Sequence, residues 1–164
     1  MIRKELTKEK ALGRLESLCS RSEQCEYDLT RKLLNWGLTS SVRTEILESL
    51  KENKFLDNAR FAKSYANDKA KFAYWGPQKI RAELIKRRIN SDMIKDALAN
   101  IPQDVWKEGL IRCVSSKGRN FDLIGEAAWE NRKKLFHYLI SRGFPSAAAN
   151  KAINYLKKNQ EENG

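Results

Sequence analysis

The densest groups of side chains that could do chemistry in this sequence are basic. Residues 79–89 read KIRAELIKRRI and set five cations against one carboxylate, and a second basic group follows around residues 132–142. Fixed positive charges attract phosphates and acidic protein surfaces. The members of the two groups are Lys79, Arg81, Lys86, Arg87 and Arg88, and Arg132, Lys133, Lys134 and Arg142. They predict a site for an acidic partner, with ordinary solvated surface as the alternative.

Patterns typical of catalysis or metal binding are missing from the sequence. It has no glycine-rich phosphate loop, and its one histidine, His137, has no cysteine or acid at a useful spacing. The cysteines Cys19, Cys25 and Cys113 are odd in number and widely separated, which suits neither a disulfide framework nor a zinc site. We therefore expect no enzyme, no cofactor and no metal, with the cysteines packed against helices.

The composition favours a helical protein. The chain has 164 residues, a formal net charge of +11, 41% hydrophobic and 32% charged residues, and only 8 glycines and 3 prolines. Such a chain is too apolar for disorder and too poor in turn formers for a many-stranded sandwich. Its uncharged runs fall short of the roughly 18 to 20 residues that cross a bilayer. We expect a soluble, cytoplasmic monomer without a membrane partner.

The cations lie on elements that recur three times. Residues 28–50, 79–101 and 134–156 align without a gap, and their apolar positions coincide. Within each copy the apolar residues recur three or four positions apart, as on one face of a helix, so each copy predicts two helices. Shared columns contain Leu29, Ile80 and Leu135; Leu33, Leu84 and Leu139; Leu38, Ile89 and Phe144; Leu47, Leu98 and Ile153; and Leu50, Ile101 and Leu156.

Turn and cap signals punctuate the copies. The position that ends the first helix holds Gly37, Arg88 or Gly143, where a left-handed backbone is common. Ser40, Ser91 and Ser146 are the expected N-caps of the next helix. Cys25, Gly76 and Asn131 are the expected caps of the first, with Pro77 at its first position. A further helix precedes each pair, with Thr7, Asp57 and Asp104 as expected caps.

We therefore predict an all-α fold of three tandem three-helix repeats, stacked into an elongated, curved array with one concave face. The expected units are residues 1–56, 57–104 and 105–158, followed by a frayed polar tail at 159–164. A unit of this size buries little apolar surface alone, so neighbouring units must cover one another. The connection at residues 115–130 has no clear pattern.

Two motifs in the middle repeat resemble a known family. Leu56, Asp57, Asn58, Arg60, Phe61 and Ala62 match an L-D-D-x-R-F-A segment, and Gly76, Pro77, Ile80, Glu83 and Leu84 match G-P-x-x-I-x-x-E-L. Both segments are typical of the RecX family of bacterial RecA regulators. Residues 25–38 resemble that family's S-x-x-E-L-x-x-K-L-x-x-x-G segment, and the helical layout extends the likeness over nearly the whole chain. Asn58, Cys25, Asp28 and Arg88 depart from the pattern at positions that look structural.

The resemblance implies a regulatory protein that binds the RecA nucleoprotein filament along its groove. Such a protein limits filament extension, strand exchange, ATP hydrolysis and coprotease activity, in DNA repair, homologous recombination and the SOS response. The residues themselves leave two other functions open. One is a sequence-nonspecific binder of single- or double-stranded DNA that uses helix-turn-helix-like units without RecA. The other is a scaffold for an unrelated acidic protein.

Two local alternatives also stay open. Arg60 either contacts an acidic partner or pairs with a carboxylate of a neighbouring helix and locks two repeats together. Phe72, Tyr74 and Trp75 either stack on bases or plug the junction between repeats.

Overall fold

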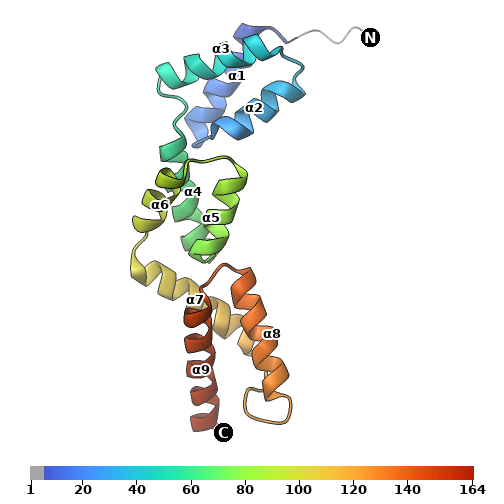
Figure 1. Cartoon of the computed structure of the whole chain (residues 1–164), viewed down its shortest axis with the longest axis vertical. Coiled ribbons are helices and arrows are strands. Elements are labelled where there is room, and N and C mark those ends of the chain that lie inside the picture. The colour runs from blue at the N-terminus through green and yellow to red at the C-terminus, as the bar shows by residue number, and fades with distance from the viewer. Residues whose placement is uncertain (1–5) are drawn as a thin grey trace.

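The structure, a computed structural model, describes residues 6–164 and contains nine helices and no strand over that range (Figure 1). The predicted all-α class is confirmed. The helices are α1 (Lys8–Arg21), α2 (Glu26–Asn35), α3 (Ser40–Glu52), α4 (Asn58–Lys71), α5 (Pro77–Lys86), α6 (Ser91–Ala99), α7 (Gln103–Gly118), α8 (Ala128–Ser141) and α9 (Ser146–Asn163). None of these helices is long and apolar enough to cross a membrane.

Three hydrophobic clusters follow one another along the chain. The first gathers side chains of α1, α2 and α3 around Leu15 and Leu33. The second is built on α4, α5 and α6 around Ile80 and Leu84, and the third on α7, α8 and α9 around Leu135. We call these groups of helices the first, second and third units. The exact residues that bound each unit stay a prediction. Helix α7 begins at Gln103, just before the predicted boundary between residues 104 and 105.

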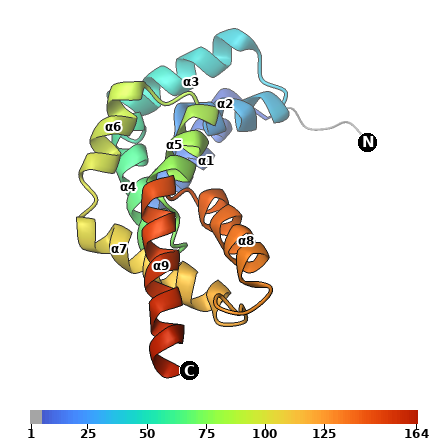
Figure 2. The same ribbon diagram turned by 60° about the horizontal axis from the view of Figure 1, so that its bottom comes forward.

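The three units form an elongated, curved array, as predicted (Figures 1 and 2). The second helix of each unit, α2, α5 or α8, lies along the same side of the array, at the right in Figure 1. Figure 2 shows the same three helices toward the inner side of the curve, with α3, α6 and α7 on the outer side. Equivalent helices therefore lie along one side of the array.

The helix starts correct several predicted caps. Thr7 and Asp57 cap α1 and α4 as expected, by accepting from the amides of Lys10 and Arg60. The predicted serine caps are wrong by one residue: Thr39, Asn90 and Pro145 are the caps, and Ser40, Ser91 and Ser146 begin the helices. Threonine and asparagine are also preferred caps, whereas Pro145 makes no side-chain cap bond, and the alignment alone could not separate adjacent positions. Pro102, not Asp104, precedes α7.

The left-handed residues that end α2, α5 and α8 are confirmed. Gly37, Arg88 and Gly143 have φ angles of 79°, 55° and 96°. The amide of the residue after each one reaches back to a carbonyl in the helix; Ile89, for example, donates to Leu84 at 3.1 Å. This closure satisfies carbonyls that would otherwise lack a partner at the helix end.

The third unit differs most from expectation. Its second helix begins at Ala128, so Asn131 is not a cap; its side chain donates instead to the carbonyl of Asp122. The polar end of the chain, which we expected to be frayed, continues α9 to Asn163. Gln160 explains this extension, because its side chain bonds both Phe121 and Leu123 of the α7–α8 connection at 2.9 and 3.0 Å.

Candidate functional site

Helix α5 is the element that carries the densest predicted basic group. It begins at Gly76 and Pro77 as predicted, and Ile80 and Leu84 are fully buried in the second cluster. The intervening positions must therefore face outward, and Arg81, Lys86 and Arg88 are exposed. Lys79 and Arg87 are half-buried.

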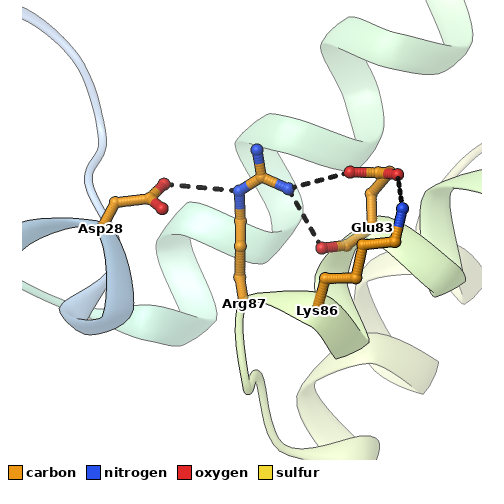
Figure 3. A network of polar contacts seen from close by, with 4 residues as sticks. All are labelled: Asp28, Glu83, Lys86 and Arg87. Carbon is orange, nitrogen blue, oxygen red and sulfur yellow. Dashed lines mark hydrogen bonds and ion pairs between the residues drawn. The ribbon is translucent and has the colours of Figure 1, made fainter. Parts of the chain in front are cut away.

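Arg87 joins the first and second units (Figure 3). Its guanidinium bonds the carboxylate of Asp28 on α2 at 3.3 Å and that of Glu83 on α5 at 3.2 Å, and it lies 5.0 Å from the ring centroid of Tyr65. The side chain is only 26% exposed, so solvent screens these contacts less than those of a surface pair. Lys86 bonds the same Glu83 at 2.7 Å, and this hydrogen bond is the main reason that the pKa of Glu83 lies below its ordinary value.

A second set of bonds at the same junction involves Arg60. Its guanidinium pairs with Glu23 at 3.0 Å and donates to the carbonyl of Lys54 at 2.9 Å. Of the two interpretations left open by the sequence, the structure contains the ion pair with the neighbouring unit, although Glu23 lies in the connection between α1 and α2 and not in a helix. Arg60 is thereby oriented toward the first unit.

At this junction Asn58 supplies the helix cap that Cys25 does not make. Cys25 stands at the N-cap of α2 but makes no side-chain cap bond, because its thiol is buried in the second cluster. The Oδ1 atom of Asn58, from α4, accepts instead from the amide of Glu26 at 2.9 Å. One unit therefore caps a helix of its neighbour.

The second and third units meet at the start of α5. The amide of Gly76 donates to the carbonyl of Arg142 at 2.7 Å, and that of Gln78 donates to Gly143 at 3.0 Å. The turn between α8 and α9 thus satisfies amides that have no partner within α5. The guanidinium of Arg142 donates to the carbonyl of Ala73 on the same side of the junction.

The remaining predicted cations are less constrained. Lys79 lies 4.2 Å from the ring centroid of Trp75, Arg88 5.5 Å from that of Tyr27, and Lys133 4.9 Å from that of Trp129. Arg132 donates to the carbonyl of Ala128 at 3.3 Å, within its own helix.

Arg81 on α5 and Lys134 on α8 are exposed, and neither has an ion-pair or hydrogen-bond partner among residues 6–164. Exposed charges of this kind are available to a partner at the lowest cost in broken internal contacts. They come from equivalent helices on the same side of the array.

The three aromatic side chains of the connection before α5 lie in different surroundings. Tyr74 packs with the third cluster and Trp75 with the second, whereas Phe72 is 77% exposed. Tyr74 and Trp75 therefore plug the junction between units. Only Phe72 has a face available for stacking.

One basic surface was missed by the sequence analysis. A pocket of about 800 Å³ between α1 and α2 is lined by Lys10, Arg14, Arg21 and Lys32, with Trp36 at its side. These cations come from two helices and form no run in the sequence. The alignment gave one indication of this surface: Trp36, at the side of the pocket, occupies the column that holds Arg87 and Arg142 in the other two repeats.

Comparison with known proteins agrees with this architecture. Residues 57–98 match the family model described as RecX, second three-helix domain. A regulatory protein RecX from Stenotrophomonas maltophilia is 30% identical over 153 residues, which cover 93% of this chain and 88% of that protein. The chain belongs to the RecX family. A RecX from Xanthomonas campestris is 32% identical over 136 residues, covering 83% of this chain and 78% of the relative.

Chain lengths vary among the RecX relatives. This RecX-family chain spans 89% of a Yersinia enterocolitica relative but only 58% of one from Clostridium botulinum. A crystal structure of RecX from Lactobacillus salivarius has the same fold, with a TM-score of 0.74 and 17% identity over 91% of this chain and 96% of that one. A second RecX crystal structure gives a TM-score of 0.77 and 23% identity over 90% of this chain and 71% of that one.

Proposed function

We propose that this RecX-family chain binds the groove of the RecA filament on single-stranded DNA and inhibits filament extension. Strand exchange and the ATPase and coprotease activities of RecA fall as a result, without any catalysis by the chain itself. The acidic partner that the basic groups predict is, on this proposal, a helical polymer of protein and DNA. The chain acts as a cytoplasmic monomer, and any contact with DNA is secondary to contact with the filament.

The observation that supports this proposal most strongly is the arrangement of α2, α5 and α8 along one side of a curved array. An elongated body with cations on successive units suits an extended, regularly charged partner better than a small compact one. Arg81 and Lys134, without internal partners in the described chain, are the leading contact residues.

The predicted cations divide into two roles. Arg60, Arg87 and Arg142 hold neighbouring units in position through Glu23, Asp28 and the carbonyl of Ala73. Their contribution to binding is indirect, because they orient the helices that meet the partner. The cations proposed to contact the filament directly are Lys79, Arg81, Lys86, Arg88, Arg132, Lys133 and Lys134.

Binding to the filament and to bare DNA at the same salt concentration tests the proposal. We expect tight, salt-dependent binding to RecA filaments and much weaker binding to the single-stranded or duplex DNA alone. A variant with Lys79, Arg81, Lys86 and Arg88 changed to alanine should bind filaments poorly while keeping its helical circular dichroism. Equal affinity for bare DNA and filaments would favour the nonspecific DNA-binding function instead.

The matched control removes four exposed lysines from helices α4, α6, α7 and α9. These are Lys63, Lys95, Lys107 and Lys151. This variant has the same net charge as the first, so a general loss of positive charge would weaken both equally. We expect the control to retain most of its filament affinity. Equal losses in the two variants would remove α5 from the proposed interface.

A further inference from the structure

A pocket at the junction of the second and third units contains an unusual concentration of hydrogen-bond donors. It has a volume of about 420 Å³ and lies between α7, the end of α8 and the connection before α5. Arg112, Arg119 and Arg142 line it, together with the hydroxyl groups of Ser115 and Ser116 and two tyrosines. No carboxylate is among its lining residues. The site is therefore cationic and rich in donors.

The three arginines differ in the ion pairs and hydrogen bonds that they already make. Arg112 pairs with Glu108 at 3.1 Å at the exposed edge of the pocket. Arg119 is exposed and has no ion pair in the described part of the chain. Arg142 donates from one terminal nitrogen to the carbonyl of Ala73, but its Nε atom is buried and has no partner among residues 6–164. A buried donor without an acceptor is uncommon in folded proteins.

The wall of the pocket beside Arg142 is conformationally strained. Tyr74 has a φ angle of 54°, which is rare for a bulky residue. Two contacts hold it there: its carbonyl accepts from the thiol of Cys113 at 3.5 Å, and Arg112 lies 5.2 Å from its ring centroid. Strain of this kind is retained where the surroundings fix it, frequently at ligand sites.

We propose that this pocket binds a phosphate group. Guanidinium groups bond phosphate oxygens in pairs, and the two serine hydroxyls supply further donors to the remaining oxygens. The Nε atom of Arg142 is closed to solvent, so on this proposal the phosphate lies against a terminal nitrogen of that guanidinium. Its source is either the backbone of a nucleic acid or a free phosphate or nucleotide, since the recognised chemistry is the same.

Occupation of this pocket would also stabilise the junction between the units. The carbonyl of Arg142 accepts from the amide of Gly76 at the start of α5, so a ligand on the Arg142 side chain restrains the residue that holds α5 in place. The proposal goes beyond the function proposed above, and its test contains no RecA, so the two can fail separately.

Titration of the full chain with inorganic phosphate, at ionic strength kept constant with chloride, tests the site by NMR. We expect the Nε–H signal of Arg142 and the amide signals of Ser115 and Ser116 to shift together. Arg119→Gln should weaken phosphate binding by about tenfold, the effect of one charge-assisted hydrogen bond. Ser115→Ala with Ser116→Ala should also weaken it, although this variant leaves the net charge unchanged.

Lys107→Gln, an exposed position of the same helix outside the pocket, is the control and should leave the affinity within about twofold of the parent. A short oligothymidylate that shifts the same signals and competes with phosphate would identify a nucleic-acid backbone as the source; phosphate binding without such competition would identify a free phosphate. An Arg142 Nε–H signal that does not move, or equal losses in Arg119→Gln and Lys107→Gln, would overturn the proposal.

Discussion

Gly37 and Gly143 occupy equivalent turns but have different surroundings, and this difference predicts the strength of the contact between the second and third units. Both have positive φ angles, 79° and 96°. A Cβ at Gly37 would meet open space. A Cβ at Gly143 would lie 2.5 Å from the backbone nitrogen of Lys79 and 2.8 Å from the carbonyl oxygen of Gly76. Alanine at position 143 must therefore displace the start of α5.

The expected costs follow from these contacts. Gly37→Ala should lower the free energy of unfolding by about 1–2 kcal/mol, because an L-residue in the left-handed region costs about that much. Gly143→Ala has the same cost and also weakens the bonds from Gly76 to Arg142 and from Gln78 to Gly143. Each such bond contributes a net of about 1 kcal/mol, so we expect a total of about 3–4 kcal/mol.

Urea unfolding followed by far-ultraviolet circular dichroism measures both variants. Gly76→Ala serves as a further control, because Gly76 has an ordinary φ of −78° and its added Cβ would meet the backbone of Gly143. It should be destabilising through the contact alone. If Gly143→Ala costs no more than Gly37→Ala, or if Gly76→Ala is neutral, the units do not meet as described.

Three further predictions concern the junction of the first and second units. Arg87→Met should lower the free energy of unfolding by about 1–3 kcal/mol, since the half-buried Asp28 and Glu83 both lose their bond to Arg87, and Glu83 keeps only its bond to Lys86. A double-mutant cycle with Asp28→Ala should show coupling; additive costs would contradict the pairing. Asn58→Ala should cost about 1 kcal/mol in the same assay through loss of the α2 cap, whereas Asn58→Asp should cost little; similar costs would exclude the cap. Burial raises the pKa of Cys25 from 9.0 to about 11, so the folded chain keeps this proton where the unfolded chain loses it. Stability should fall by up to about 3 kcal/mol between pH 9 and 11, and Cys25→Ser should reduce that fall more than Cys19→Ser, because burial raises the pKa of the Cys19 thiol by a smaller amount.

The features that the sequence predicted well are those encoded locally. Apolar residues three and four positions apart identified the helices, and Gly37, Arg88 and Gly143 marked the left-handed turns. Pro77 likewise located the start of α5. Each of these signals depends on the conformation of one residue or one helical face, which neighbouring residues determine.

The features that were missed depend on residues far apart in the chain. Arg87 bonds Asp28, 59 positions away, and no periodic pattern within either helix indicates that pairing. Gln160 holds the α7–α8 connection through Phe121 and Leu123, so a tail that looks polar and unsupported is helical. Long side chains that bridge units become visible only once the units are placed side by side.

The candidate site shows the same division. The basic character of α5 follows from its sequence, but the division between cations that hold the units and cations that are free does not. Arg81 and Arg87 are the same residue type in the same short basic segment. In the structure Arg87 bonds Asp28 of the first unit and Glu83 of its own unit, whereas Arg81 is exposed.

The most direct test of the central claim is inhibition of RecA ATPase on single-stranded DNA by a double variant of Arg81 and Lys134, the predicted site cations whose side chains have no partner among residues 6–164. Arg81→Ala with Lys134→Ala is compared with Lys95→Ala and Lys107→Ala, which removes the same charge from α6 and α7. We predict that the parent and the control inhibit at substoichiometric concentrations and that the first variant requires at least about tenfold more protein, given two lost charge contacts of modest strength. Inhibition by that variant at parental concentrations would contradict the assignment of this side of the array to the filament.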